Sequence, residues 1–245
     1  MAGLSALILA GCNSGSKKNY DKVFQKHQTR IDEIRKYLTG VKSSLPEAGT
    51  IAVNAGNVNP ALNMADKEAA NNTIVLQYHM LDQPETVYSV DSLFGLFNNP
   101  LAAEAFQWTG INKERKIFER DYLKDDEVDK IISVLSTERF PYLLVVKPTK
   151  MVPLQIKTDA TFEGGNATAA FYLFDLRSKK LLSSNTFSAG PDAELSIAYK
   201  QKAGAAGQRE AAKSEAKQAM QKNMRAKVYN WLKEITNNNA VVMGY

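Results

Sequence analysis

The chain holds a single thiol, Cys12, and the residues just before it are Leu9, Ala10 and Gly11. A thiolate is a strong nucleophile, well suited to accept a lipid or an acyl group. One thiol cannot form a disulfide within the chain, and it cannot supply the several thiolates of a structural zinc site. The chemistry expected at Cys12 is therefore attachment of a group to its sulfur.

The two histidines, His27 and His79, are the only imidazoles of the chain. Neither belongs to an H-E-x-x-H motif, and no G-x-S-x-G sequence supplies a serine nucleophile. His27 falls on the apolar face of a predicted helix and His79 falls within a predicted strand, so packing is the simpler role for both. We expect no catalytic residue, no metal site and no cofactor.

The densest group of carboxylates is Asp125-Asp126-Glu127 followed by Asp129. This group lacks the alternating oxygen ligands, central glycine and closing glutamate of a calcium-binding loop. Acidic residues in the first turn of a helix complement the helix dipole, which explains the group without a ligand. Asp175 stands just before a predicted hairpin turn, where an aspartate commonly accepts backbone hydrogen bonds.

Two long helices are predicted, one in each terminal part of the chain. In residues 20–42 apolar side chains recur at spacings of three, four and seven, which is typical of an amphipathic helix. Residues 205–235 begin with an alanine-rich, charged stretch of high helix propensity and continue with an apolar stripe. The members of that stripe are Met220, Met224, Val228, Trp231 and Ile235.

Several segments have the β-branched and aromatic composition of strands. They are residues 73–80, 142–147, 152–162, 167–176 and 181–188. Gly164-Gly165-Asn166 and Arg177-Ser178-Lys179-Lys180 separate the last three, as the turns of β-hairpins do. The sequence therefore predicts one α+β domain over residues 20–245. We expect an antiparallel-rich meander sheet of about four or five strands, flanking helices and long amphipathic terminal helices.

Large apolar residues gather around Gly95 and Pro100, where short helices are predicted over residues 91–97 and 100–108. A further helix is predicted from Asp125 or Asp126. The simplest role for the aromatic residues is packing against the sheet. If they are exposed, they form a patch for a partner, because aromatic side chains commonly anchor interfaces. That candidate patch comprises Phe94, Phe97, Phe106 and Trp108.

The formal net charge of +5 is distributed unevenly along the 245 residues. Residues 17–42 carry eight basic and three acidic side chains, and residues 200–245 carry nine and three. Residues 43–199 carry fourteen basic and twenty acidic side chains. Basic terminal segments keep exposed helix faces soluble, and lysines next to a membrane would also favour anionic headgroups. No nucleic-acid-binding motif is present, and no nucleic-acid partner is expected.

The sequence Leu9-Ala10-Gly11-Cys12 resembles the lipobox of bacterial lipoprotein signal peptides. The resemblance implies that a signal peptidase recognises Leu9, Ala10 and Gly11, where the small side chains of Ala10 and Gly11 let the extended segment enter a narrow protease site. It also implies cleavage before Cys12, a diacylglycerol on its sulfur and an acyl chain such as palmitate on the new amino group. Each buried methylene adds about 0.8 kcal/mol of membrane affinity, so two or three chains would hold the protein firmly. Residues 1–11 would then be the signal peptide and residues 12–19 the lipidated cysteine with a polar tether. Asn13, in place of the inner-membrane retention aspartate, implies the outer membrane, with the protein facing the periplasm.

A second resemblance concerns the strand 141–146 and the hairpin 169–182, with Asp-Leu before the turn and Lys-Leu-Leu after it. This hairpin is similar to one in periplasmic assembly lipoproteins of the penicillin-binding-protein activator and curli-secretion type. The resemblance implies an α/β domain that binds other envelope proteins without catalysis, and it transfers no functional residue.

We therefore expect a lipid-anchored protein of the bacterial cell envelope. It would contact the membrane through Cys12 and bind another envelope protein or the cell wall. Two alternatives remain open at this point, namely a lipid-anchored hydrolase of envelope substrates and a carrier of a small apolar ligand. Converging acidic or imidazole groups in a cleft would favour the hydrolase, and a closed apolar cavity would favour the carrier.

Overall fold

The computed structural model describes residues 13–47, 62–64, 72–81, 141–157, 162–191, 204–236 and 242–243. Its helices are α1 (Asn13–Ser44), the short 3-10 helix η1 (Tyr78–Leu81) and α4 (Ala205–Ile235). The long strands are β3 (Tyr142–Val152), β6 (Asn166–Asp175) and β7 (Lys180–Ala189). The shorter strands are β1 (Asn63–Met64), β2 (Thr73–Gln77), β4 (Gln155–Ile156), β5 (Phe162–Glu163) and β8 (Val242–Met243).

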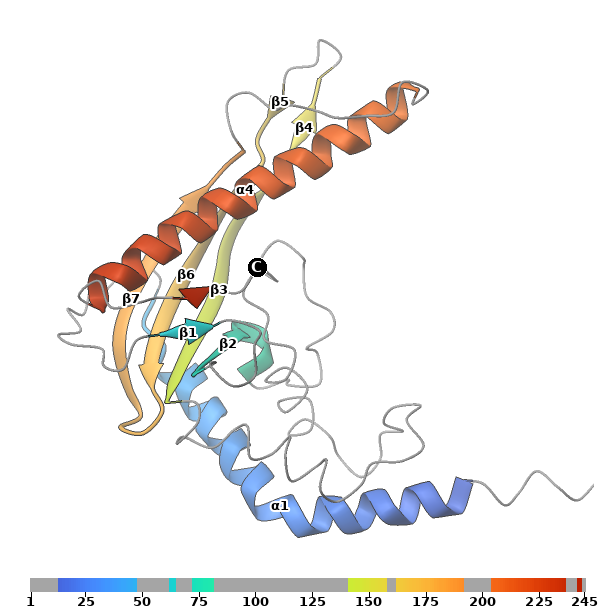
Figure 1. The fold of residues 1–245 in the computed structure, drawn as a ribbon, viewed down its shortest axis with the longest axis vertical. Helices are drawn as coiled ribbons and strands as arrows, with labels where there is room; N and C mark the ends of the chain where they lie inside the picture. Colours follow the sequence, from blue (N-terminus) through green and yellow to red (C-terminus); the bar gives the residue numbers. More distant parts are fainter. Residues whose placement is uncertain are drawn as a thin grey trace, which may run out of the picture.

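Within the described part of the chain, the main sheet has four strands in the order β2-β3-β6-β7 (Figure 1). β2 pairs with β3 in parallel, whereas the β3–β6 and β6–β7 pairs are antiparallel. The fold is therefore α+β with a mixed sheet. Two small sheets accompany it, a parallel β1–β8 pair and an antiparallel β4–β5 pair.

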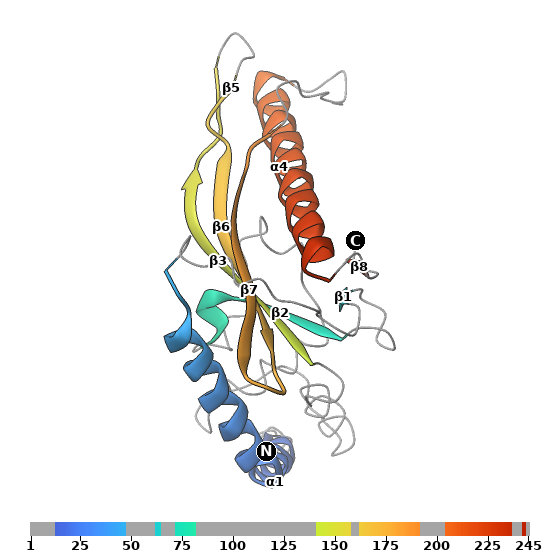
Figure 2. The same ribbon diagram turned by 90° about the vertical axis from the view of Figure 1, so that its left-hand side faces the viewer.

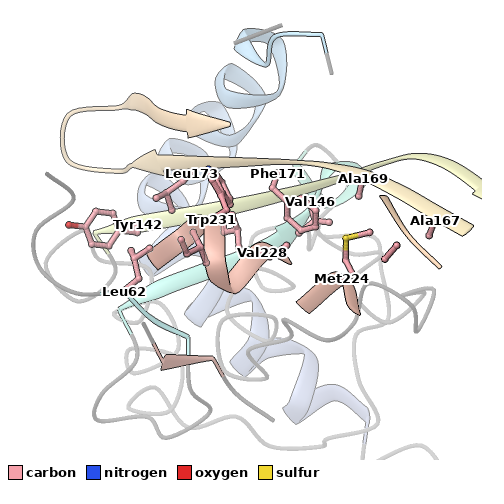
Figure 3. Packing of buried hydrophobic residues seen from close by; sticks show 13 residues of the cluster. Leu62, Tyr142, Val146, Ala167, Ala169, Phe171, Leu173, Met224, Val228 and Trp231 are labelled. Carbon is pink, nitrogen blue, oxygen red and sulfur yellow. The ribbon is translucent and has the colours of Figure 1, made fainter. Parts of the chain in front are cut away.

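One face of the main sheet is covered by α4, which lies along the length of the long strands (Figures 1 and 3). Side chains alternate between the two faces of a strand, so Leu144 and Val146 of β3 share this face with Phe171 and Leu173 of β6. The stripe predicted for α4 packs against them. Met224, Val228, Trp231 and Leu232 are buried there, with Met220 and Ile235 partly buried.

The opposite face of the sheet is covered near one end by the last turns of α1 and by η1 (Figure 2). Tyr172 points to this face because it alternates with Phe171 and Leu173. Its hydroxyl donates a 3.0 Å hydrogen bond to the carbonyl oxygen of Pro46, just after α1. Leu38 and Val41 of α1 are buried, as are Met80 and Leu81 of η1. The described elements thus form three layers at this end of the sheet.

The half of the sheet farther from the β6–β7 turn is termed the distal half. It comprises residues 147–152 of β3, 166–170 of β6 and 186–189 of β7. β2 does not reach it, because the last residue pair between β2 and β3 joins Gln77 to Val146. The distal half is therefore a three-stranded ribbon, extended by the small β4–β5 pair (Figure 1).

Several sequence predictions agree with the described elements. α4 has the predicted bounds 205–235, and β6 and β7 match the predicted strands to within one residue at each end. α1 begins at Asn13 and so includes the segment 13–19 that was expected to be a tether. The predicted helices of residues 91–97 and 100–108 and the one starting at 125 or 126 lie outside the described residues.

Two strand predictions are wrong in detail. The strand predicted over residues 73–80 ends at Gln77, where the chain turns into η1. The strand predicted over residues 152–162 is interrupted: β3 ends at Val152, and β4 and β5 form a separate short pair. Pro153 lacks a backbone N–H, which explains the interruption at that point. As a result the meander runs β3, β6, β7, and β3 pairs directly with β6.

Candidate functional site: a lysine and hydroxyl face of the sheet

The distal half of the sheet carries a polar surface on the face opposite α4. In the antiparallel register, Lys147 lies beside Ala170 and Thr186, and Lys150 lies beside Thr168 and Ser188. Residues in such cross-strand rows point to the same face. We call these five polar residues, Lys147, Lys150, Thr168, Thr186 and Ser188, the lysine–hydroxyl face.

Hydrogen bonds order the hydroxyls of this face. The hydroxyl oxygens of Thr168 and Ser188 lie 2.7 Å apart across the β6–β7 pair. Thr149, at the register shift of β3, donates from its hydroxyl to the carbonyl oxygen of Thr168 over 3.1 Å. Lys150 and Ser188 are exposed, and the other members of the face are half-buried. The surface thus presents ammonium groups and fixed hydroxyls to the solvent.

An aromatic ring joins this face to the end of α1. The ammonium nitrogen of Lys147 lies 4.8 Å from the centroid of the Tyr78 ring, and that of Lys42 lies 4.7 Å from the same centroid. Such cation–π contacts are favourable by roughly 0.5–1 kcal/mol at exposed positions. Tyr78 thereby holds two positive charges close together next to the lysine–hydroxyl face.

Tyr172 fixes the segment after α1 beneath this cluster. Burial, followed by the proximity of Tyr78, raises the pKa of its hydroxyl, which keeps the group a hydrogen-bond donor to Pro46. The cluster is therefore positioned by three segments far apart in the sequence, namely α1, η1 and β3.

A second polar group lies around the β6–β7 turn, at the end of the sheet away from the distal half. Asp175 accepts hydrogen bonds from the backbone N–H of Arg177 and from the Ser178 hydroxyl, at 2.8 Å and 2.9 Å. This confirms the role predicted for Asp175. Burial, followed by the charge of Asp175, raises the pKa of Tyr37 to about 12 and also raises that of Tyr142. Both phenols therefore stay protonated at neutral pH and cannot act as bases.

The residues predicted to have functional roles lie mostly outside the described part of the chain. This holds for Leu9, Ala10, Gly11 and Cys12, and for Phe94, Phe97, Phe106 and Trp108 of the predicted patch. His79 lies in η1 and not in a strand, and it is half-buried.

Among the described residues, no three His, Cys, Asp or Glu side chains are grouped as metal ligands would be. Among the large apolar side chains of the described residues, that of Met151 is exposed, with a relative accessibility of 48%.

The cluster of Lys42, Tyr78 and Lys147 was not predicted from the sequence. One signal for it was present, because Lys147 and Lys150 follow the wholly apolar stretch 142–146 and mark where the strand leaves the core. The strand prediction stopped at Lys147 and so missed the exposed continuation. The approach of Lys42 and Tyr78 depends on tertiary packing, which local sequence does not encode.

No model of a known protein family matches the chain, and no curated protein matches it either. Neither of the described long helices has a stretch apolar enough to span a bilayer.

Proposed function

We propose that the chain is a lipid-anchored protein of the bacterial cell envelope, attached through Cys12 and facing the periplasm from the outer membrane. The observation that carries this proposal is the sequence Leu9-Ala10-Gly11-Cys12, which contains the only thiol of the chain. Residues 1–11 would be removed, and α1 would lead from the lipid to the sheet. A helix rises about 1.5 Å per residue, so a helix over Asn13–Ser44 would hold the domain some tens of ångströms from its anchor.

Metabolic labelling with a radioactive fatty acid tests the anchor. The wild-type chain should take up the label, and Cys12→Ala should abolish it. A matched control, Cys12→Ala with Ser43→Cys, returns a thiol at an exposed position of α1 and should remain unlabelled. Equal labelling of the wild type and Cys12→Ala would refute the anchor.

The function proposed for the domain is non-enzymatic binding of an anionic envelope partner, either a protein or the cell wall, through the lysine–hydroxyl face. Both charged residues of that face are lysines, and Lys42 stands beside it over Tyr78. In the Thr168–Ser188 pair, one hydroxyl donates to the other, and the hydroxyl that accepts keeps its own proton available for a carboxylate or phosphate oxygen. We propose the predicted aromatic patch of Phe94, Phe97, Phe106 and Trp108 as a second contact surface for the partner.

A charge reversal tests the face. Lys147→Glu with Lys150→Glu should reduce binding of the full chain to isolated cell-wall sacculi, and should remove crosslinks formed in native membranes to protein partners. Wild-type binding should weaken as salt rises, because exposed charges are screened within about 10 Å at 0.1 M. Lys36→Glu with Lys222→Glu makes the same charge change at exposed helix positions and should bind as the wild type does. Equal loss in both double variants would show a general charge effect and refute a role for this face.

We also propose that both terminal helices are amphipathic over their predicted lengths, 20–42 and 205–235. For the first helix, the support is the spacing of its apolar residues together with the burial of Leu38 and Val41 near its end. A synthetic peptide of residues 20–42 should gain helical circular dichroism on anionic vesicles. A spectrum unchanged by the vesicles would contradict the proposal.

A further inference from the structure

The outer edge of β7 has backbone groups that point away from β6. In an antiparallel strand, alternate residues direct their N–H and C=O groups away from a given neighbour. The N–H of Tyr142 faces β2, so by the registers of β3 with β6 and of β6 with β7 the N–H of Thr186 is one of these outward groups. It donates a 2.8 Å hydrogen bond to the side-chain oxygen of Asn185. Ser188 and Gly190, two and four residues further along, have the same orientation. A strand edge of this kind is a template for pairing with another chain.

Side chains of α4 occupy the next two outward positions. The Lys227 ammonium donates to the carbonyl oxygen of Ser188 over 2.6 Å, and the Asn223 side-chain amide donates to that of Gly190 over 3.1 Å. Asn223 and Lys227 are four residues apart and so lie on the same side of the helix. Two successive outward positions of β7, Thr186 and Ser188, and the position of Gly190 just after the strand therefore each have a backbone group engaged by a side chain.

The other edge of the distal half is formed by β3, and a different feature closes it. The N–H of Tyr142 donates to the carbonyl oxygen of Asn72, so Tyr142 and alternate residues of β3 face β2. Val146 is the last of them to pair with β2, and the next outward residue is Pro148. Proline has no N–H, and the register of β3 shifts directly after it, which also disrupts an edge.

We propose that these features close the distal half of the sheet to strand addition by a second copy of the chain, with α4 as the cover of the β7 edge. A second copy is the relevant occupant because identical β7 edges present mutually complementary N–H and C=O groups to each other in an antiparallel pair. Asn185, Asn223 and Lys227 compete for those groups within one molecule. This proposal concerns the fold alone and goes beyond the proposed function. Its failure would not affect the anchor or the lysine–hydroxyl face, and their failure would not affect it.

The test opens the β7 edge in the full chain. All variants carry Cys12→Ser, which removes the only thiol and with it any lipid or disulfide. The opened variant combines Asn185→Ala, Asn223→Ala and Lys227→Met, where methionine keeps most of the lysine stem. Sedimentation velocity over a range of concentrations should show self-association at least tenfold tighter than that of the parent. At concentrations where the variant is monomeric, the Thr186 amide should exchange its hydrogen at least tenfold faster.

Controls separate edge opening from a general surface change. Lys222→Met with Asn230→Ala makes similar changes at exposed positions of α4 and should behave as the parent does. Lys227→Arg keeps a donor for Ser188 and should remain monomeric. If the triple variant does not fold by circular dichroism, Asn185→Ala with Lys227→Met, both at exposed positions, carries the same expectation. Unchanged sedimentation and unchanged Thr186 exchange in the opened variant would overturn the proposal, as would equal association of the Lys222 and Asn230 control.

Discussion

Tyr37 places a phenol hydroxyl between α1 and the end of the sheet, close to Asp175. Its oxygen is buried, and no hydrogen-bond partner for it is found among the described residues. The ring is contacted from one side by the Lys179 ammonium, 5.8 Å from its centroid. Burial and the nearby carboxylate both disfavour the phenolate, and they raise the pKa of Tyr37 from 10.0 to about 12.

Tyr37→Phe should therefore change the alkaline stability of the protein. Between pH 10 and pH 12 the unfolded chain releases a phenol proton that the folded chain retains. Stability due to neutral Tyr37 is thus fully present below pH 10 and is lost as the pH rises toward 12. Urea unfolding at pH values from 7 to 12 should show a shallower alkaline decline for Tyr37→Phe, with little change at pH 7, since a buried hydroxyl without a partner adds little. An alkaline decline identical to that of the wild type would contradict the assignment.

At the scale of elements, the turn between β5 and β6 depends on two glycines with positive φ, Gly164 at 77° and Gly165 at 72°. A Cβ at Gly164 would overlap the carbonyl oxygen of Pro153, and one at Gly165 would meet a methyl carbon of Leu154 at 2.8 Å. The turn brings Asn166 back to pair with Val152. These glycines therefore set where the long β6 strand begins, and with it the register that builds the lysine–hydroxyl face.

Gly164→Ala should destabilise the protein by roughly 1–3 kcal/mol, because alanine resists this backbone conformation and its Cβ has no space. Gly40→Ala is the matched substitution, since Gly40 lies within α1 and a Cβ there would meet nothing within 4 Å. It should stabilise the protein by roughly 0.5–1 kcal/mol through helix propensity. The midpoint of urea unfolding measures both changes, and a Gly164→Ala midpoint at or above that of the wild type would rule out the strain.

The elements differ in how well the sequence predicts them. α4 was predicted with its bounds because the stripe from Met220 to Ile235 follows the helical period and faces one apolar sheet. β6 and β7 were predicted because turn residues delimit them. The parallel partnership of β2 with β3 could not be predicted, because the two strands are separated by residues 78–141 and pair through backbone groups that carry no sequence signal. For the same reason the cluster of Lys42, Tyr78 and Lys147 could not be found by inspection of local sequence.

At the scale of the whole molecule, protection is concentrated in the centre of the sheet. β6 is bonded to a strand on each side, and its residues 169–174 are buried. The first turns of α4 are exposed, and Gly204 supplies no side-chain cap. Stability against local opening should therefore be uneven along the chain.

Hydrogen exchange measured by mass spectrometry should show this distribution. We expect amides of residues 170–174 to exchange on the order of a hundred times more slowly than those of residues 208–211 in the first turns of α4. Exchange in β6 as fast as in the start of α4 would contradict the described core. Peptides from β7 provide an internal reference, because β7 has one neighbouring strand among the described residues.

The place of α4 in the chain has a consequence for the order of folding. Leu144, Val146, Phe171 and Leu173 form an apolar surface that is synthesised before its cover, which includes Val228, Trp231 and Leu232. A nascent chain that has reached residue 190 already contains all of the main sheet and still lacks the helix that buries one face of it. Until about forty more residues have been made, that sheet has only part of its stabilising burial, so the chain should stay loosely structured and open to chaperones. Completion of α4 would then act as the committing step in folding of the main sheet.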